Sequence, residues 1–150
     1  PVVSIRPGRP VALSQSDANL AWVYDMVAGA GSWPHEASSS SVLQVGDVLY
    51  VGTANGKGSD HRTTPSPGGA SLIALDKRSG RLLARDNAGI APGVFHGQWS
   101  SPSYGVVNGR PLVFYGGGDG VCYAFDAKPE PRGNGKPDSA GKPKKKKRDA

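Results

Sequence analysis

Disulfides, membrane spans and long helices are all missing from this chain of 150 residues. Its single cysteine, Cys122, excludes an intramolecular disulfide and leaves the redox compartment open. No apolar run approaches the length of a membrane span, and no signal-peptide pattern is present. No helical period of apolar residues lasts for three turns, which excludes a helix bundle. Because the chain starts at Pro1 rather than Met, we expect a processed chain or a piece of a longer protein.

A basic excess is also missing from most of the chain, although the net charge is +6. Residues 128–150 hold nine Lys or Arg and three Asp or Glu, whereas residues 1–127 hold nine of each and sum to zero. The folded part therefore has no positive surplus with which to attract nucleic acid or anionic lipid. No large apolar residue follows Phe125, so we expect residues 128–150 to form a disordered tail or a linker.

Glycine and proline are abundant, with 22 and 13 residues, and this composition favours short strands joined by turns. The clearest hairpin is predicted over residues 71–85. Its first strand alternates between two faces, and its turn runs from Asp76, a side-chain acceptor, to Gly80, which can adopt a left-handed conformation.

Further strands are predicted where aromatic and β-branched residues gather between turn signals. These strands are residues 20–25, 40–45, 48–53, 99–107, 112–115 and 121–126. The dipeptides Gly46-Asp47, Asn108-Gly109 and Asp119-Gly120 predict tight turns between neighbouring strands. Residues 1–19, with three prolines, read as an irregular N-terminal segment.

Two stretches, residues 40–76 and 100–126, repeat the same order of strands and turns. Each begins with a Ser-Ser pair, and the third strands end at Asp76 and Asp126, fifty positions apart. A period of this order with four short strands per unit is typical of a β-propeller blade. We therefore predict an antiparallel all-β fold over residues 20–127. It would comprise two four-stranded blades and, at residues 20–25, the outer strand of a third.

The repeated motifs carry a family resemblance. They are Ala-Leu-Asp-Lys-Arg-Ser-Gly-Arg-Leu-Leu (residues 74–83), Tyr-Ala-Phe-Asp (123–126), Ser-Ser-Pro (100–102) and Gly-Asp-Gly (118–120). Together they resemble the repeat of the pyrroloquinoline-quinone-type (PQQ-like) β-propellers. That superfamily includes quinoprotein alcohol dehydrogenases and the propeller lipoprotein of bacterial outer-membrane assembly. A longer pattern over residues 20–126 is similar to secreted bacterial proteins of this type, which implies a periplasmic or extracellular location.

The resemblance implies roles in blade packing rather than in catalysis. The family repeat usually carries a Trp where this chain has Ala84, while Trp22 keeps the corresponding place in the preceding unit. Trp99 is predicted to pack between blades rather than to line a ligand pocket. Family enzymes need metal-binding carboxylate and amide residues and a catalytic Asp, and none of these matches a residue here.

All three histidines fall in loops that an up-and-down blade places on one face. His61 lies between a second and a third strand, whereas His35 and His96 precede the two Ser-Ser pairs. Three imidazoles on one face could bind a transition metal or a polar ligand. Three acidic residues are near in sequence and could join such a site: Asp25, Glu36 and Asp60. The alternative is that each histidine hydrogen-bonds the backbone and holds a long loop in place.

Other motifs favour structural readings. The glycine-rich residues 116–120 precede a strand and lack Lys followed by Ser or Thr, so they predict a close-packed turn rather than a phosphate loop. No spaced set of aspartates supports calcium at Asp119. Cys122 is predicted to be a buried, inert thiol. The serines of the two Ser-Ser pairs have no base at a defined spacing, so a serine hydrolase is not supported.

The sequence favours a non-catalytic propeller module that binds a ligand or a protein, as part of a longer exported chain. Missing blades or a protein partner would cover its exposed blade faces. One alternative is a fragment of a quinone-dependent dehydrogenase, with PQQ and calcium as cofactors. A second alternative is polyanion binding through the basic run at residues 143–148, which also resembles a nuclear import signal. The composition of this run favours a solvated linker over both, because a basic run is seldom specific.

Overall fold

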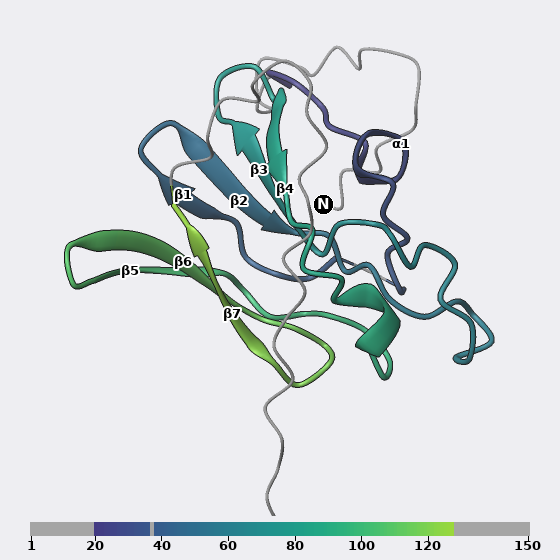
Figure 1. Cartoon of the computed structure of the whole chain (residues 1–150). Helices are drawn as coiled ribbons and strands as arrows, with labels where there is room; N and C mark the ends of the chain where they lie inside the picture. The colour runs from purple at the N-terminus through teal and green to yellow at the C-terminus, as the bar shows by residue number, and fades with distance from the viewer. Residues whose placement is uncertain (1–19, 37, 128–150) are drawn as a thin grey trace, which may run out of the picture.

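The computed structural model describes residues 20–36 and 38–127, and these residues are mostly β (Figure 1). Seven strands form two antiparallel sheets, each with neighbouring strands in chain order. The first sheet contains β1 (Leu43–Val45), β2 (Val48–Gly52), β3 (Leu72–Asp76) and β4 (Leu82–Arg85). The second contains β5 (Ser103–Val107), β6 (Arg110–Gly116) and β7 (Cys122–Asp126). The helical elements are α1 (Met26–Ala30) and one 3₁₀ turn, η1 (Ala91–Gly93).

The predicted all-β character and the four-stranded first sheet are confirmed, but no closed propeller is formed by the described residues. The second sheet has three strands there rather than four. The predictions for residues 1–19 and 128–150 lie outside the described residues. No helix in residues 20–36 and 38–127 is both long and apolar enough to cross a membrane.

Two hairpins turn at the predicted dipeptides. Val45 pairs with Val48 across Gly46-Asp47, and Gly46 has a φ of 59°. Val107 pairs with Arg110 across Asn108 and Gly109, whose φ values of 50° and 77° both lie in the left-handed region. Asn and Gly tolerate this conformation better than other residues, which is why these dipeptides fix the registers of both hairpins.

The β3–β4 turn also forms as predicted. The Asp76 carboxylate accepts hydrogen bonds from the amides of Arg78 and Ser79 and from the Ser79 hydroxyl. The Ser79 hydroxyl and amide together hold the Asp76 pKa below its usual range, because they stabilise the ionised form. Gly80, with a φ of 70°, lies under the ring of Trp22, and the Trp22 indole donates to the carbonyl of Lys77 at 3.0 Å. This contact fixes the segment before α1 to the hairpin.

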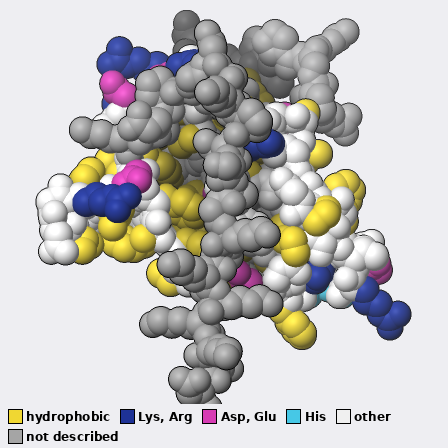
Figure 2. Space-filling model, in the orientation of Figure 1, with side chains coloured by type: hydrophobic (Ala, Val, Ile, Leu, Met, Phe, Trp, Pro, Cys, Tyr) yellow, Lys and Arg dark blue, Asp and Glu magenta, His cyan; other side chains and the backbone are white. Residues whose placement is uncertain are grey.

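The main core lies in the angle between the two sheets, where hydrophobic side chains gather (Figure 2). Tyr50 and Leu72 from the first sheet pack in one cluster with Val113 and Tyr115 from the second. Polar contacts also join the sheets: the Tyr50 hydroxyl donates to the carbonyl of Ala127 at 2.7 Å. The two predicted Ser-Ser pairs meet as well, since the Ser41 amide donates to the Ser101 hydroxyl at 2.9 Å. The sheets therefore form one packed unit.

The predicted strand at residues 20–25 is wrong, because this segment pairs with no strand and leads into α1. The Asp25 side chain caps α1 by accepting from the amides of Val27 and Ala28, and Gly31 ends the helix with a φ of 64°. An Asp followed six residues later by Gly is a helix signal that the aromatic composition of residues 20–25 obscured. The prediction of a buried Cys122 is also wrong, since this thiol is exposed. Cys122 occupies an outward-facing position on β7, where side chains alternate between the two faces.

Candidate metal centre

The loops on one side of the sheets bring the three histidines together. His35 lies in the segment before β1, His61 in the β2–β3 connection and His96 in the β4–β5 connection. In an antiparallel sheet with strands in chain order, these connections emerge at the same end of the strands. In Figure 1 they lie to the right of both sheets, and in Figure 2 histidine atoms reach the surface at the lower right.

The histidine site, defined as His35, His61 and His96, brings three imidazole rings close together. One ring nitrogen from each histidine lies within 4.8 Å of the other two. The Nε2 atoms of His35 and His96 are 3.1 Å apart, and the Nδ1 atoms of His61 and His96 are 3.2 Å apart. Ligand nitrogens of a tetrahedral zinc ion, with bonds of about 2.0–2.1 Å, lie about 3.3 Å apart. The predicted clustering of the three histidines on one face is therefore confirmed. The two short contacts use different nitrogens of His96, so binding of one ion would require a ring to turn.

The three rings differ in exposure and in how they meet. His35 is only 3% exposed, His96 is partly buried and His61 is exposed. The His61 and His96 rings stack at 4.7 Å with 13° between their planes, while His35 meets His96 edge-on at 4.3 Å. The site thus has a buried floor at His35 and an open side at His61.

One set of tautomers matches the hydrogen-bond contacts of the three rings. The Nδ1 atom of His35 lies 2.8 Å from the carbonyl oxygen of Lys57 and must donate to it, so its Nε2 carries a lone pair. His96 then donates from Nε2 to His35 and accepts at Nδ1 from His61. In this direction each of the two ring–ring contacts has one donor and one acceptor. A backbone carbonyl that holds the far nitrogen of a histidine is also the usual support for a metal ligand.

The backbone of Lys57 links two of the histidines. Its carbonyl accepts from the His35 ring, and its amide donates to the carbonyl of His96 at 3.1 Å. The preceding Gly56 has no room for a side chain, because a Cβ there would lie 2.9 Å from the His96 carbonyl oxygen and 3.1 Å from the His35 Cβ. This close approach sets the spacing of His35 and His96.

Beneath the site, two buried amide side chains tie the loops together. Asn55 accepts from the Trp33 amide and donates to the carbonyls of Ser66 and Gly69. Gln98 donates to the Asn55 carbonyl and to the Ser71 hydroxyl, and its own oxygen accepts from the Gly118 amide. Sequence reasoning missed both residues, because an Asn or Gln in a loop carries no pattern that predicts burial.

The glycine-rich run forms a close-packed turn, as predicted. A Cβ on Gly118 would lie 2.5 Å from the carbonyl oxygen of Gly97, so this position needs glycine. The Asp119 carboxylate is occupied locally, accepting from the Val121 amide and the Tyr123 hydroxyl. Gly120 follows with a φ of 80°. The run thereby supports the segment that carries His96, since Gly118 also accepts from the Phe95 amide.

The acidic residues near the site have separate roles. Asp25 caps α1, and the Asp60 carboxylate accepts from Arg62 and Thr63 within its own turn, which lowers the Asp60 pKa. Only Glu36 comes near the rings, with its Oε1 3.9 Å from the His35 Nε2. Asp126, predicted as structural, forms a two-bond pair with Arg110 across the edge of the second sheet.

Trp99 lies beside the histidines rather than deep between the sheets. Its ring centroid is 5.6 Å from that of His96 and 6.3 Å from that of His35, and the side chain is 43% exposed. Backbone conformation at the site is unusual too, because Glu36 and His61 have φ values of 59° and 54°. Non-glycine residues adopt such values rarely, and they gather at ligand sites.

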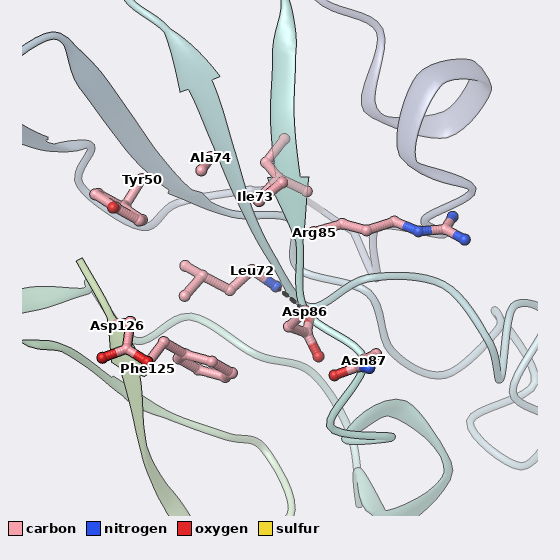
Figure 3. A pocket seen from close by; sticks show the side chains of 10 residues that line it. Tyr50, Leu72, Ile73, Ala74, Arg85, Asp86, Asn87, Phe125 and Asp126 are labelled. Carbon is pink, nitrogen blue, oxygen red and sulfur yellow. Dashed lines mark hydrogen bonds between the residues drawn. The ribbon is translucent and has the colours of Figure 1, made fainter. Parts of the chain in front are cut away.

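A second hollow, of about 390 Å³, opens between the sheets (Figure 3). Tyr50, Leu72 and Phe125 line it, and Asp86 lies at one end. The Asp86 carboxylate already accepts from the amides of Ser71, Leu72 and Ala88. Because the Asp86 carboxylate is occupied by these three amides, it is less available to a ligand in the hollow than the ring nitrogens of the histidine site are.

Comparison with protein-family models, curated proteins and solved structures finds no match. Three imidazoles with one ring nitrogen each within 4.8 Å of the others offer the donor set that borderline metal ions such as Zn²⁺, Co²⁺ or Ni²⁺ prefer.

Proposed function

We propose that this chain is a binding module built from PQQ-like propeller blades, and that its loop face binds one transition-metal ion through His35, His61 and His96. The observation that carries the proposal is the convergence of one ring nitrogen from each histidine within 4.8 Å. Supporting it, three separate connections contribute the three ligands, so the metal would also join those connections. The module would belong to a longer exported protein, with further blades or a protein partner at its open sheet edges.

The hydrogen-bond partners of the three imidazole rings favour metal binding over a purely structural role for the histidines. Loop anchoring alone would need each imidazole to contact backbone, yet within residues 20–36 and 38–127 only the His35 ring has a backbone hydrogen-bond partner. His61 and His96 are held by other imidazoles instead. A single metal ion takes one nitrogen of His96, so binding would replace one of its two ring–ring hydrogen bonds and require a ring to turn.

A quinone-dependent dehydrogenase remains the second candidate from the family resemblance. It would need PQQ and calcium, and calcium favours carboxylate and carbonyl oxygens over imidazole. Polyanion binding through residues 143–148 involves residues outside those described, and would depend steeply on salt.

A thermal-stability series separates these functions. The full chain is heated with Zn²⁺, with Ca²⁺ plus PQQ, and with a polyanion at two salt concentrations. The proposal predicts a rise in melting temperature with Zn²⁺ alone, because a ligand that binds only the native state stabilises it. The His96→Ala variant should lose this rise, whereas the Phe95→Ala variant, which removes an 89% exposed neighbour, should keep it. Stabilisation by Ca²⁺ plus PQQ and not by Zn²⁺ would contradict the proposal.

A further inference from the structure

The histidine site has three ligands of its own and one open side. Among the described residues, no carboxylate or thiolate joins the three histidines in a metal-ligating group. Zinc sites that are closed by the protein have four protein ligands, whereas sites that act on other molecules keep the fourth position free. The exposure of His61 places that free position toward solvent.

An aromatic ring and a carboxylate lie next to the histidine site. Trp99 lies against both His35 and His96, at centroid distances of 6.3 and 5.6 Å and tilted to each ring. Glu36 places a carboxylate oxygen 3.9 Å from the His35 Nε2, and its side chain is 67% exposed. A negatively charged ligand would therefore approach beside a carboxylate, whereas a flat neutral ring would pack against the indole.

We infer that a metal held by the histidine site takes, as its fourth ligand, a neutral aromatic nitrogen donor of the imidazole class, flanked by Trp99. This inference rests on the proposed metal site and adds its ligand. The donor would be a free imidazole-type molecule or a histidine side chain of a partner, since both present the same ring. Coordination through the ring nitrogen places the face or edge of that ring toward Trp99.

The test uses the full chain loaded with Co²⁺, whose visible absorption depends on the number and type of its ligands. Imidazole, a doubly blocked neutral histidine and acetate are titrated separately into the Co²⁺ protein. The inference predicts that imidazole shifts the visible bands with saturation and binds more tightly than acetate. A matching shift with blocked histidine indicates that a histidine side chain of a partner can supply the fourth ligand. A shift with imidazole alone indicates that the fourth ligand comes from a small molecule.

Two variants separate the role of Trp99 from folding. Trp99→Ala should keep Co²⁺ affinity while weakening imidazole about three- to tenfold, because one flanking ring is lost. Phe95→Ala, which removes an exposed aromatic ring next to His96 in sequence, should change neither affinity. Tighter binding of acetate than imidazole, or unchanged imidazole affinity in Trp99→Ala, would overturn the inference. A Co²⁺ spectrum that never responds to imidazole would overturn it while leaving the metal site intact, whereas failure to retain Co²⁺ would remove both.

Discussion

The Nε2 atoms of His35 and His96 lie 3.1 Å apart although 61 positions separate the two residues in the chain. Lys57 holds this pair from both sides, because its carbonyl accepts from His35 and its amide donates to the His96 carbonyl. The spacing of the two ligands thus depends on backbone hydrogen bonds as well as on side-chain packing. These backbone hydrogen bonds preorganise His35 and His96 in the metal-free protein.

Removal of any one histidine should weaken metal binding strongly. His35→Ala, His61→Ala and His96→Ala each remove one of three ligands, and we expect Zn²⁺ affinity to fall by at least about 100-fold, beyond the usual effect of removing a supporting group. Competition with a coloured chelator measures the affinities. Ser59→Ala, at an exposed position of the same loop as His61, is the control and should bind as the parent does. Equal affinity in all four proteins would contradict the assignment.

Gly56→Ala should disturb the site without touching a ligand side chain. The new Cβ would press on the His96 carbonyl and the His35 Cβ, so the Lys57 hydrogen bonds would have to lengthen. We expect about a tenfold loss of Zn²⁺ affinity, comparable to loss of other supporting groups, and a lower melting temperature. Gly68→Ala is the matched control, because a Cβ there meets nothing within 4 Å. Equal behaviour of the two variants would show that the close approach at Gly56 is unimportant.

The amide pair beneath the site should matter for folding. Gln98 is 2% exposed, and Gln98→Ala leaves the Asn55 carbonyl, the Ser71 hydroxyl and the Gly118 amide without this partner. We expect the free energy of unfolding to fall by about 2–4 kcal/mol, from the small cavity and the unsatisfied groups together. Urea denaturation of the metal-free protein measures it. Gln44→Ala, at an exposed position with one local hydrogen bond, should cost under about 0.5 kcal/mol.

Much of the fold could be predicted from sequence because its turns depend on single residues. Gly46, Gly80 and Gly109 adopt left-handed conformations, and such residues mark hairpin ends whatever surrounds them. Strand order alone also predicted that the three loops carrying the histidines lie at the same end of the strands. The order of the strands was enough for this second prediction, because strand direction decides which loops are neighbours.

The rest could not be predicted because it depends on tertiary contacts. Residues 20–25 have strand-like composition, but Trp22 packs on Gly80 and the segment pairs with no strand. Burial of Gln98 and the role of the Lys57 backbone leave no trace in composition or spacing. Strand order could bring the histidines to one side, but the close approach of His35 and His96 depends on loop packing around Gly56.

Acid should destabilise the protein partly through the β3–β4 turn. The Ser79 hydroxyl and amide lower the Asp76 pKa from 3.8, so the carboxylate stabilises the fold above about pH 4. That contribution is lost as the pH falls through the lowered pKa, because the folded state must then take up a proton that the unfolded state binds more readily. Ser79→Ala should move the Asp76 pKa back toward its ordinary value. A two-dimensional NMR titration of the Asp76 carboxyl measures both proteins, and identical pKa values would contradict this account.

Calorimetric titration of Zn²⁺ into the full chain tests the central claim most directly. We predict one ion bound per chain in the parent protein, with that binding event missing in His35→Ala, His61→Ala and His96→Ala while Ser59→Ala keeps it. Thermal melts of the same samples should show the metal-dependent stabilisation in the parent and Ser59→Ala proteins only. Absence of saturable Zn²⁺ binding, or one ion bound equally by all the variants, would contradict a metal centre at these three histidines.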